Sequence, residues 1–317
     1  MERRPYGAAA MKLSAVAYGA MSIRHDPELR DGVSPSLLTA LENGVNLIDT
    51  ARAYGDSEAI VASTLKQWHG ERPFISTKVA PLNRETFRFH RPVKEAYTVQ
   101  SIRQSVEKSL AALGVETLDI VHLHQWHYLW THEPEWLEAL TTLRDEGKLH
   151  HIAVSAQDHE HDALLEVVSR KYINGAQIVF NLFESRPMNS FLPLAKARGA
   201  GVIARCVYDS GGLSDSLSRQ DFAHRPFLKF APYREYQTRL AALREAFIPE
   251  HATDIPELAL RFVLSVPGVT SATLGMPTRE MVKSACAAAE KGALDDSVVE
   301  AIRRHHVWTK NFYEKLV

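Results

Sequence analysis

The sequence predicts an α/β fold, a (β/α)8 TIM barrel in which parallel strands alternate with helices. Strand-like and helix-like segments alternate through almost all of the 317 residues. The repeating units are roughly 30–40 residues long and about eight in number, which fits this barrel. The alternative fold is a doubly wound open sheet, which usually carries a glycine-rich phosphate turn after its first strand. Gly19-Ala20-Met21 is no such turn, so the barrel is favoured.

The predicted strands are short apolar runs bounded by polar or turn-forming residues. In chain order they cover residues 15–18, 47–49, 74–78, 118–123, 152–154, 177–180, 202–204 and 271–274. Between them, apolar residues recur at spacings of three and four, which is typical of helices packed on one face. The predicted helices cover residues 35–43, 56–69, 102–113, 134–146, 164–168, 191–197, 236–247, 256–264, 280–288 and 297–306.

Capping residues mark several helix ends. Ser34-Pro35 predicts the start of the first helix, and Gly44 predicts its end. Gly114 and Gly147 end two later helices in the same way. No linker or low-complexity segment divides the chain, so we expect one domain over residues 1–317. Its long loop, at about 207–233, follows the seventh strand and is a candidate lid over the site.

Composition indicates an ordinary globular protein. Apolar residues make up 45% of the chain, and 37 Lys and Arg face 38 Asp and Glu, for a net charge of −1. With no long basic run, neither nucleic acid nor an anionic membrane is an expected partner. The two cysteines, Cys206 and Cys286, are too few for a disulfide framework. No apolar run is long enough for a signal peptide or a membrane span, so the expected location is the cytoplasm.

Four polar side chains lie at or just beyond the ends of predicted strands. Asp49 ends the second strand, Tyr54 follows in the next turn, Lys78 ends the third strand, and His124 follows the fourth. A barrel brings the C-terminal ends of its strands to one rim, where active sites of this fold lie. The sequence therefore predicts that a carboxylate, a phenol, an ammonium and an imidazole meet at this rim.

These residues resemble those of the aldo-keto reductases. The segment 44–55 is similar to the first signature of that family, and Thr77-Lys78-Val79 and Leu123-His124 match the strands that carry its other catalytic residues. The resemblance covers nearly the whole chain and implies the reduction of an aldehyde or ketone with NAD(P)H. It also implies a catalytic tetrad, Asp49, Tyr54, Lys78 and His124.

The chemistry of carbonyl reduction explains these residue types. Hydride transfer to a carbonyl leaves an alkoxide, which needs a proton and electrostatic stabilisation. A free tyrosine has a pKa near 10 and is a poor acid at neutral pH, but a nearby ammonium favours the phenolate. We therefore expect Tyr54 to donate the proton, Lys78 to assist it, and Asp49 to hold Lys78 in place. His124 would orient the carbonyl of a small aldehyde, ketone or sugar-like substrate.

The resemblance also implies a nicotinamide dinucleotide, NADP in the first place and NAD as the alternative. Arg279 and Lys283 could pair with a 2′-phosphate, whereas Ala156, Ser284 and Ala285 depart from the residues with which the family holds its cofactor. The expected cofactor-binding residues follow the first, second and fifth to eighth strands and are Gly19, Ala20, Met21, Asp49, Ser155, Gln177, Arg205, Val207, Ser210, Gly212, Gly275, Thr278, Arg279 and Lys283.

Two other functions stay open at the level of sequence. His122 and His124 point the same way from one strand, as two ligands of a barrel metallohydrolase would. The altered cofactor contacts are also compatible with a reductase-like protein that senses a nucleotide or catalyses redox-neutral chemistry. Aromatic residues near the rim are candidates to line a substrate pocket: Trp126, Trp130, Tyr208, Phe222 and Phe227. The sequence carries no signal for an oligomeric state.

Overall fold

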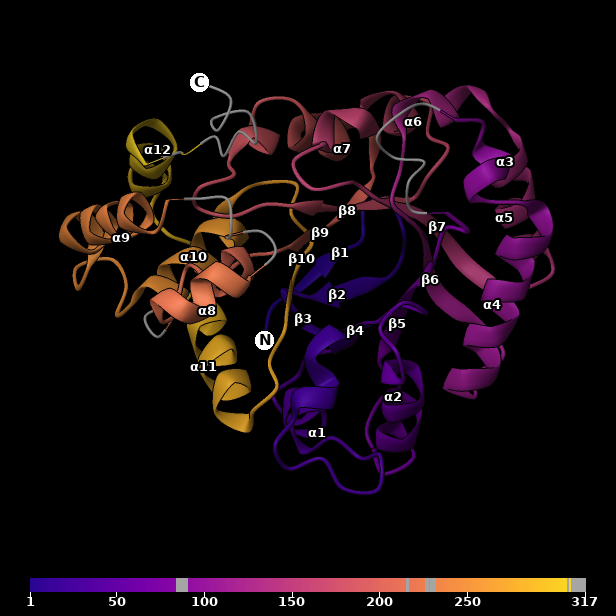
Figure 1. The fold of residues 1–317 in the computed structure, drawn as a ribbon, viewed down its shortest axis with the longest axis horizontal. Helices are drawn as coiled ribbons and strands as arrows, with labels where there is room; N and C mark the ends of the chain where they lie inside the picture. Colours follow the sequence, from indigo (N-terminus) through magenta and orange to yellow (C-terminus); the bar gives the residue numbers. More distant parts are fainter. Residues whose placement is uncertain (84–90, 215–216, 226–227, 229–231, 307, 309–317) are drawn as a thin grey trace.

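The computed structural model describes residues 1–83, 91–214, 217–225, 228, 232–306 and 308. Eight parallel strands close into a barrel, so the predicted fold class is confirmed (Figure 1). The barrel strands are β3 (Val16–Gly19), β4 (Leu47–Asp49), β5 (Phe74–Val79), β6 (Leu118–His124), β7 (Leu149–Ser155), β8 (Gly175–Val179), β9 (Gly201–Arg205) and β10 (Ser271–Leu274). Neighbouring strands follow chain order, and β10 pairs with both β9 and β3 to complete the ring.

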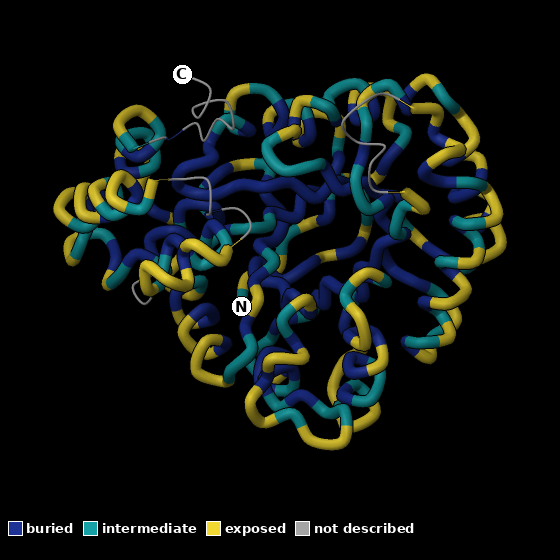
Figure 2. The backbone as a smooth tube through the Cα atoms, viewed as in Figure 1, coloured by how far each residue is buried: buried dark blue, intermediate teal, exposed yellow. Residues whose placement is uncertain are grey.

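Helices surround the barrel and present one face to it. Figure 2 shows buried residues along the strands and exposed residues on the outer sides of the helices. None of the helices in the described part of the chain is both long and apolar enough to cross a membrane. The helices are α1 (Pro35–Glu42), α2 (Ser57–Leu65), α3 (Val93–Ala96), α4 (Val99–Leu113), α5 (Glu135–Asp145), α6 (Leu165–Ser169), α7 (Phe191–Arg198), α8 (Arg219–His224), α9 (Tyr233–Phe247), α10 (Ile255–Ser265), α11 (Arg279–Glu290) and α12 (Asp296–His305).

The capping residues act as the sequence predicts at most helix ends. The Ser34 side chain accepts a hydrogen bond from the backbone N–H of Leu37 at the start of α1. Gly114 ends α4 with φ of 65°, a left-handed conformation that glycine adopts without strain. The helix predicted over 56–69 is wrong at its C-terminal end, because α2 stops at Leu65. Beyond it the backbone tightens into a turn in which Trp68 N–H bonds to the Leu65 carbonyl at 3.1 Å.

An N-terminal hairpin that the sequence pattern did not predict closes the bottom of the barrel. Its strands are β1 (Arg3–Pro5) and β2 (Lys12–Ser14), and Tyr6 follows β1 into the interior. Tyr6 is fully buried against Gly175 and Gly201, the first residues of β8 and β9. A Cβ atom at position 175 would lie 1.9 Å from Tyr6 Oη, and one at position 201 would lie 2.1 Å from Tyr6 Cδ2. Because the Tyr6 ring fills this end of the barrel, both positions require glycine.

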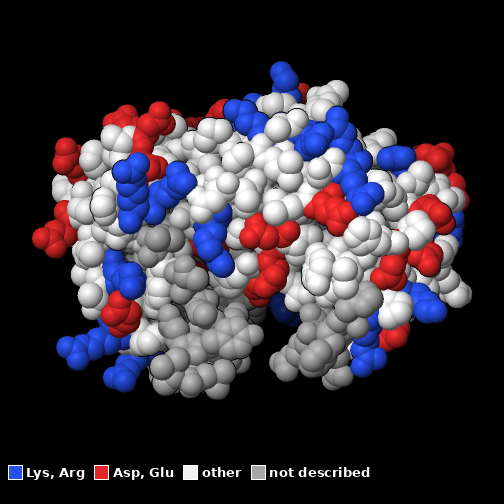
Figure 3. All heavy atoms as spheres, turned by 90° about the horizontal axis from the view of Figure 1, so that it is seen from above, with Lys and Arg blue, Asp and Glu red and all other residues white. Residues whose placement is uncertain are grey.

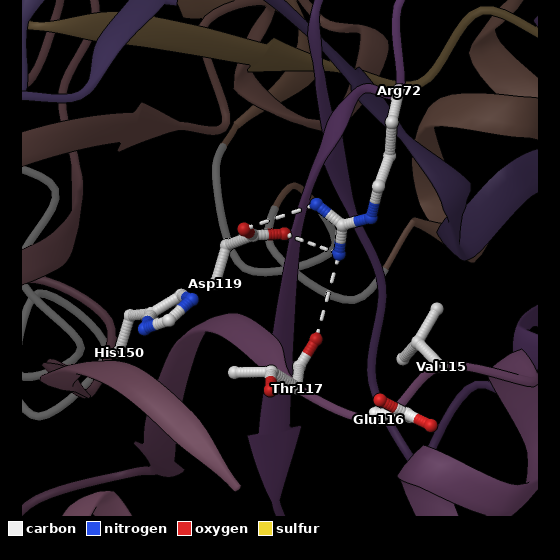
Figure 4. A pocket seen from close by; sticks show the side chains of 6 residues that line it. All are labelled: Arg72, Val115, Glu116, Thr117, Asp119 and His150. Atoms are coloured by element: carbon white, nitrogen blue, oxygen red, sulfur yellow. Dashed lines mark hydrogen bonds and ion pairs between the residues drawn. The ribbon is translucent and has the colours of Figure 1, made fainter. Parts of the chain in front are cut away.

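An ion pair ties strands together at the same end of the barrel. Arg72, just before β5, pairs with Asp119 of β6 at 3.0 Å and also bonds to the Thr117 carbonyl (Figure 4). Asp119 in turn accepts a hydrogen bond from the backbone N–H of Ile75 at 2.8 Å. The pocket in Figure 4, which His150 also lines, is thus at the end of the barrel away from the predicted catalytic rim.

Part of the loop predicted at 207–233 falls outside the described residues, namely 215–216, 226–227 and 229–231, and Phe227 is among them. The described part holds α8, whose Phe222 is buried and packs against Tyr236 of α9 with ring centroids 5.1 Å apart. Tyr236 donates a hydrogen bond to Asp209 at 2.6 Å. The described loop is thus anchored to α9 by buried contacts.

Candidate active site

Strand register brings the predicted catalytic side chains into the interior of the barrel at one end. Asp49 of β4 pairs with Ser76 of β5, and Lys78 of β5 pairs with His122 of β6. Since side chains alternate between the two faces of a strand, these residues and His124 all point inward. The C-terminal ends of three neighbouring strands thus supply Asp49, Lys78, His122 and His124.

Lys78 and Asp49 form a buried ion pair. The Lys78 ammonium donates hydrogen bonds of 2.8 Å to both Asp49 carboxylate oxygens and one of 2.9 Å to the Thr50 carbonyl. Lys78 is 1% exposed and Asp49 is 4% exposed. Burying an unpaired ammonium costs much free energy, so Lys78 is stable at this position because the Asp49 carboxylate lies beside it.

Tyr54 completes the group from the turn after β4. Its ring lies 5.0 Å from Lys78 Nζ and meets the His124 ring edge-to-face, with centroids 5.9 Å apart and an interplanar angle of 88°. A hydrogen bond with the Tyr54 side chain also helps to raise the pKa of Lys78. The structure therefore brings all four predicted residues together.

The charges of these groups follow from burial and from one another. Burial opposes the charge on Asp49 and on Lys78, but their mutual attraction prevails, so the pKa of Asp49 is lowered and that of Lys78 is raised. Burial and the charge of Lys78 lower the pKa of His124 to about 3 and that of His122 to about 4. At neutral pH the site thus holds an ion pair and two neutral imidazoles.

Two further side chains hold the Asp49 carboxylate. Ser76 Oγ donates to Asp49 Oδ1 at 2.9 Å, and Gln177 Nε2 donates to Asp49 Oδ2 at 3.0 Å. Behind Ser76, His122 Nε2 lies 3.1 Å from Ser76 Oγ. Ser76 was not predicted from the sequence, although its place two residues before Lys78 on the same strand face was the available signal.

The pair His122 and His124 does not form a metal site within the described residues. His122 is fully buried and its Nε2 atom is engaged with Ser76. Among the residues that the structure describes, no three His, Cys, Asp or Glu side chains are grouped so that they could hold a metal ion. The partner of His122 Nε2, Ser76, is therefore a member of the Asp49 hydrogen-bond network.

Residues of β7, β8 and β9 border the group on its other side. Ser155 Oγ lies 3.5 Å from Gln177 Oε1, and both side chains are buried. Arg205, at the end of β9, bonds to Asp158 at 2.7 Å and to the Ala156 carbonyl at 3.1 Å. The charge of Arg205 also helps to lower the pKa of His124, so its guanidinium lies near the tetrad. Asp158 was not among the residues predicted from the sequence.

The other predicted cofactor-binding residues lie around the same rim. Arg279, at the start of α11, forms a half-exposed ion pair with Glu28 at 3.0 Å, so its charge already has a partner. Met21 is 62% exposed. The remaining residues lie at the end of β3 or just after it, after β9, after β10 or in α11, and they are Gly19, Ala20, Val207, Ser210, Gly212, Gly275, Thr278 and Lys283.

Two of the five predicted pocket aromatics, Trp126 and Trp130, lie in the core instead. Trp126 and Trp130 are 1% and 0% exposed and meet edge-to-face at 5.9 Å. Trp126 also contacts Trp136 of α5 at 4.9 Å. Their placement as pocket-lining residues is wrong, because the segment after β6 folds its indoles onto α5.

On the face seen in Figure 3, acidic and basic side chains are interspersed.

Comparison with known proteins adds an independent finding. Residues 15–307 match the sequence model of the Aldo/keto reductase family. The NADH-specific methylglyoxal reductase of Escherichia coli is 26% identical over 311 residues, covering 91% of this chain and 93% of that protein. The D-arabinose 1-dehydrogenase of Saccharomyces cerevisiae is 27% identical over 258 residues, covering 78% and 73%.

A solved structure agrees in fold. The holo form of an aldo-keto reductase from Bacillus halodurans superposes with a TM-score of 0.76 at 23% identity. The superposition covers 99% of this chain and 100% of that one. The barrel, its strand order and its surrounding helices are thus shared over the whole chain.

Proposed function

Because this chain belongs to the aldo/keto reductase family, an oxidoreductase family, we propose that it reduces an aldehyde or ketone to an alcohol with NAD(P)H. In this proposal Tyr54 is the general acid. The observation that carries it is the contact of Tyr54 with a lysine that is itself held by two hydrogen bonds to Asp49. An ammonium fixed beside a phenol is the arrangement that proton donation at neutral pH requires.

The residues at the rim fit a nicotinamide dinucleotide. Arg205 offers a planar guanidinium that Asp158 and the Ala156 carbonyl hold in place, and such a plane can stack on an aromatic ring. Arg279 and Lys283 lie at the start of α11, where cations and helix N–H groups favour phosphates. When bound, the cofactor supplies the hydride. We propose NADP as the cofactor, with NAD as the alternative.

Each member of the tetrad has one task in this proposal. Tyr54 donates its hydroxyl proton to the alkoxide oxygen, and Lys78 stabilises the phenolate that is left. Asp49 keeps the lysine charged and aimed, because burial alone would discharge it. His124, neutral above its pKa of about 3, donates one ring N–H to the carbonyl oxygen and so orients it.

The substrate we propose is a small carbonyl compound or a sugar-like molecule. The relatives named for methylglyoxal and for D-arabinose support this class. Cys206 and Cys286 are free thiols, which supports the cytoplasm as the proposed location. Neither nucleic acid nor a membrane is a proposed partner.

Binding and turnover test the proposal in two steps. NADPH and NADH are titrated separately by fluorescence quenching, and the cofactor that binds is then used with a panel of aldehydes, ketones and sugars. We expect saturable binding and a steady carbonyl-dependent loss of absorbance at the reduced nicotinamide band. Binding without turnover on any carbonyl would favour the nucleotide-sensing alternative. Stoichiometric zinc that survives dialysis, together with no cofactor binding, would favour the metallohydrolase.

A further inference from the structure

A chain of hydrogen bonds runs from the barrel interior to the tetrad. His122 Nε2 lies 3.1 Å from Ser76 Oγ, which lies 2.9 Å from Asp49 Oδ1, which lies 2.8 Å from Lys78 Nζ. His122 and Ser76 are both fully buried. Within this series of hydrogen bonds neither His122 nor Ser76 is bonded to Tyr54, so their influence on Tyr54 passes through Asp49 and Lys78.

The direction of each hydrogen bond follows from the protons available. The ionised Asp49 carboxylate can only accept, so Ser76 donates its single hydroxyl proton to it. Ser76 Oγ is then left to accept from His122, an assignment that places the ring proton of the neutral imidazole on Nε2, while a backbone hydrogen bond to Val154 competes for that proton. Every donor in the chain therefore points toward Asp49, and each bond disperses part of the carboxylate's negative charge.

We infer that Ser76 and His122 are positioning residues that tune the electrostatic action of Lys78 on Tyr54 by solvating Asp49. This inference rests on the function proposed above. A carboxylate with fewer donors attracts the Lys78 ammonium more strongly and cancels more of its field. The negative charge that develops on the Tyr54 oxygen in the transition state is then stabilised less, and carbonyl reduction is slower.

Other charged groups face the same phenol and must be kept constant in a test. Lys78 and Asp49 lie on one side of Tyr54, His124 meets its ring, and Arg205 approaches from β9. His122 and His124 have pKa values of about 4 and about 3, so both imidazoles stay neutral above pH 6. A change in the alkaline limb of the pH profile therefore does not come from either imidazole.

Two pairs of variants test the inference on the full-length protein. Ser76→Ala removes the donor to Asp49, and Ser271→Ala is its control, because Ser271 is a buried barrel serine that bonds to the Ser14 carbonyl instead. His122→Leu removes the donor behind Ser76, whereas His122→Gln keeps an N–H at the same reach. Nuclear magnetic resonance of ¹⁵N-histidine in the cofactor-free protein reads out the His122 Nε2 proton directly.

The expected results differ for each variant. Ser76→Ala should lower kcat at pH 7 by about tenfold and move the alkaline limb of its pH profile upward by about 0.5–1 unit, the effect of one charge-assisted hydrogen bond. His122→Leu should change both in the same direction by a smaller factor, about two- to threefold. His122→Gln and Ser271→Ala should match the wild type. The Nε2 proton signal of His122 should shift upfield in Ser76→Ala.

Failure of this inference is distinguishable from failure of the proposed function. A wild type that binds no nicotinamide cofactor refutes the function, while the ¹⁵N spectrum still tests the hydrogen-bond chain. An active wild type with the same pH limb in Ser76→Ala overturns the inference, as does a His122 proton on Nδ1. If Ser76→Ala does not fold, equal profiles for His122→Leu and His122→Gln overturn it equally.

Discussion

Replacing Lys78 by methionine tests whether the buried ion pair is a requirement of the fold as well as of the site. Methionine has a similar volume but no charge, so Asp49 stays buried and loses two of its four hydrogen bonds. Removing one partner of a buried pair typically destabilises a protein by about 3–5 kcal/mol. Since Ser76 and Gln177 still donate to Asp49, we expect the lower end, about 3 kcal/mol, at pH 7.5.

The destabilisation should depend on pH in a defined direction. In the wild type the pKa of Asp49 is lowered, so its stabilising contribution is present above its ordinary pKa and is lost as pH falls through the lowered value. Without Lys78, burial raises the pKa of Asp49, and the variant gains stability as pH falls and the carboxyl group takes up a proton. The difference in unfolding free energy between the two proteins should therefore shrink from pH 7.5 toward pH 5.

Urea unfolding followed by circular dichroism measures this difference at each pH. The double variant Lys78→Met, Asp49→Asn removes both charges and should recover at least half of the loss, because no uncompensated charge is left buried. A Lys78→Met protein whose unfolding free energy at pH 7.5 lies within about 1 kcal/mol of the wild-type value, the average effect of an ordinary substitution, would refute the reasoning. So would a double variant whose loss equals the sum of the two single losses.

Three further predictions concern other parts of the structure. Because the pKa of His124 is about 3, kcat/KM should show no acid limb from this residue between pH 5 and 8, and an acid limb that disappears in His124→Gln would contradict this. Glu28→Gln frees Arg279 from its ion pair and should raise NADPH affinity about two- to fivefold relative to NADH; equal changes for both cofactors in fluorescence titrations would contradict it. Gly175→Ala places a Cβ atom 1.9 Å from Tyr6 Oη and should cost about 1–3 kcal/mol in urea unfolding, whereas an unchanged midpoint would mean that the ring moves freely.

The barrel was predictable because its elements carry local signals. Strand β10 covers the predicted residues 271–274, and Gly114 ends α4 where the glycine rule places it. The N-terminal hairpin was not predictable, since its strands have only three residues each and no alternating pattern. Its role depends on the contact of Tyr6 with two glycines about 170 and 195 residues later in the sequence. The topology of the fold creates this contact, so no local sequence pattern predicts it.

The candidate site was likewise predictable where it depends on strand ends, and not where it depends on the register between strands. Each tetrad residue lies at a strand end or in the turn that follows, so the fold class alone places them on one rim. Ser76 escaped notice because its bond to Asp49 depends on the register between β4 and β5. The partner of Arg279 is separated from it by 251 residues, and no local pattern joins them. Proximity of the tetrad is observed, whereas its chemical roles stay predictions.

The most direct test of the account is the turnover of Tyr54→Phe with the cofactor and carbonyl substrate that the wild type uses. The substitution removes the hydroxyl oxygen of a side chain that contacts Lys78 and His124, and it leaves the aromatic ring at position 54 and the His124 ring in place. We expect cofactor affinity to stay unchanged and kcat to fall by about 10²–10⁴-fold, the usual contribution of a general acid. A Tyr54→Phe protein that reduces the carbonyl at the wild-type rate would contradict the account.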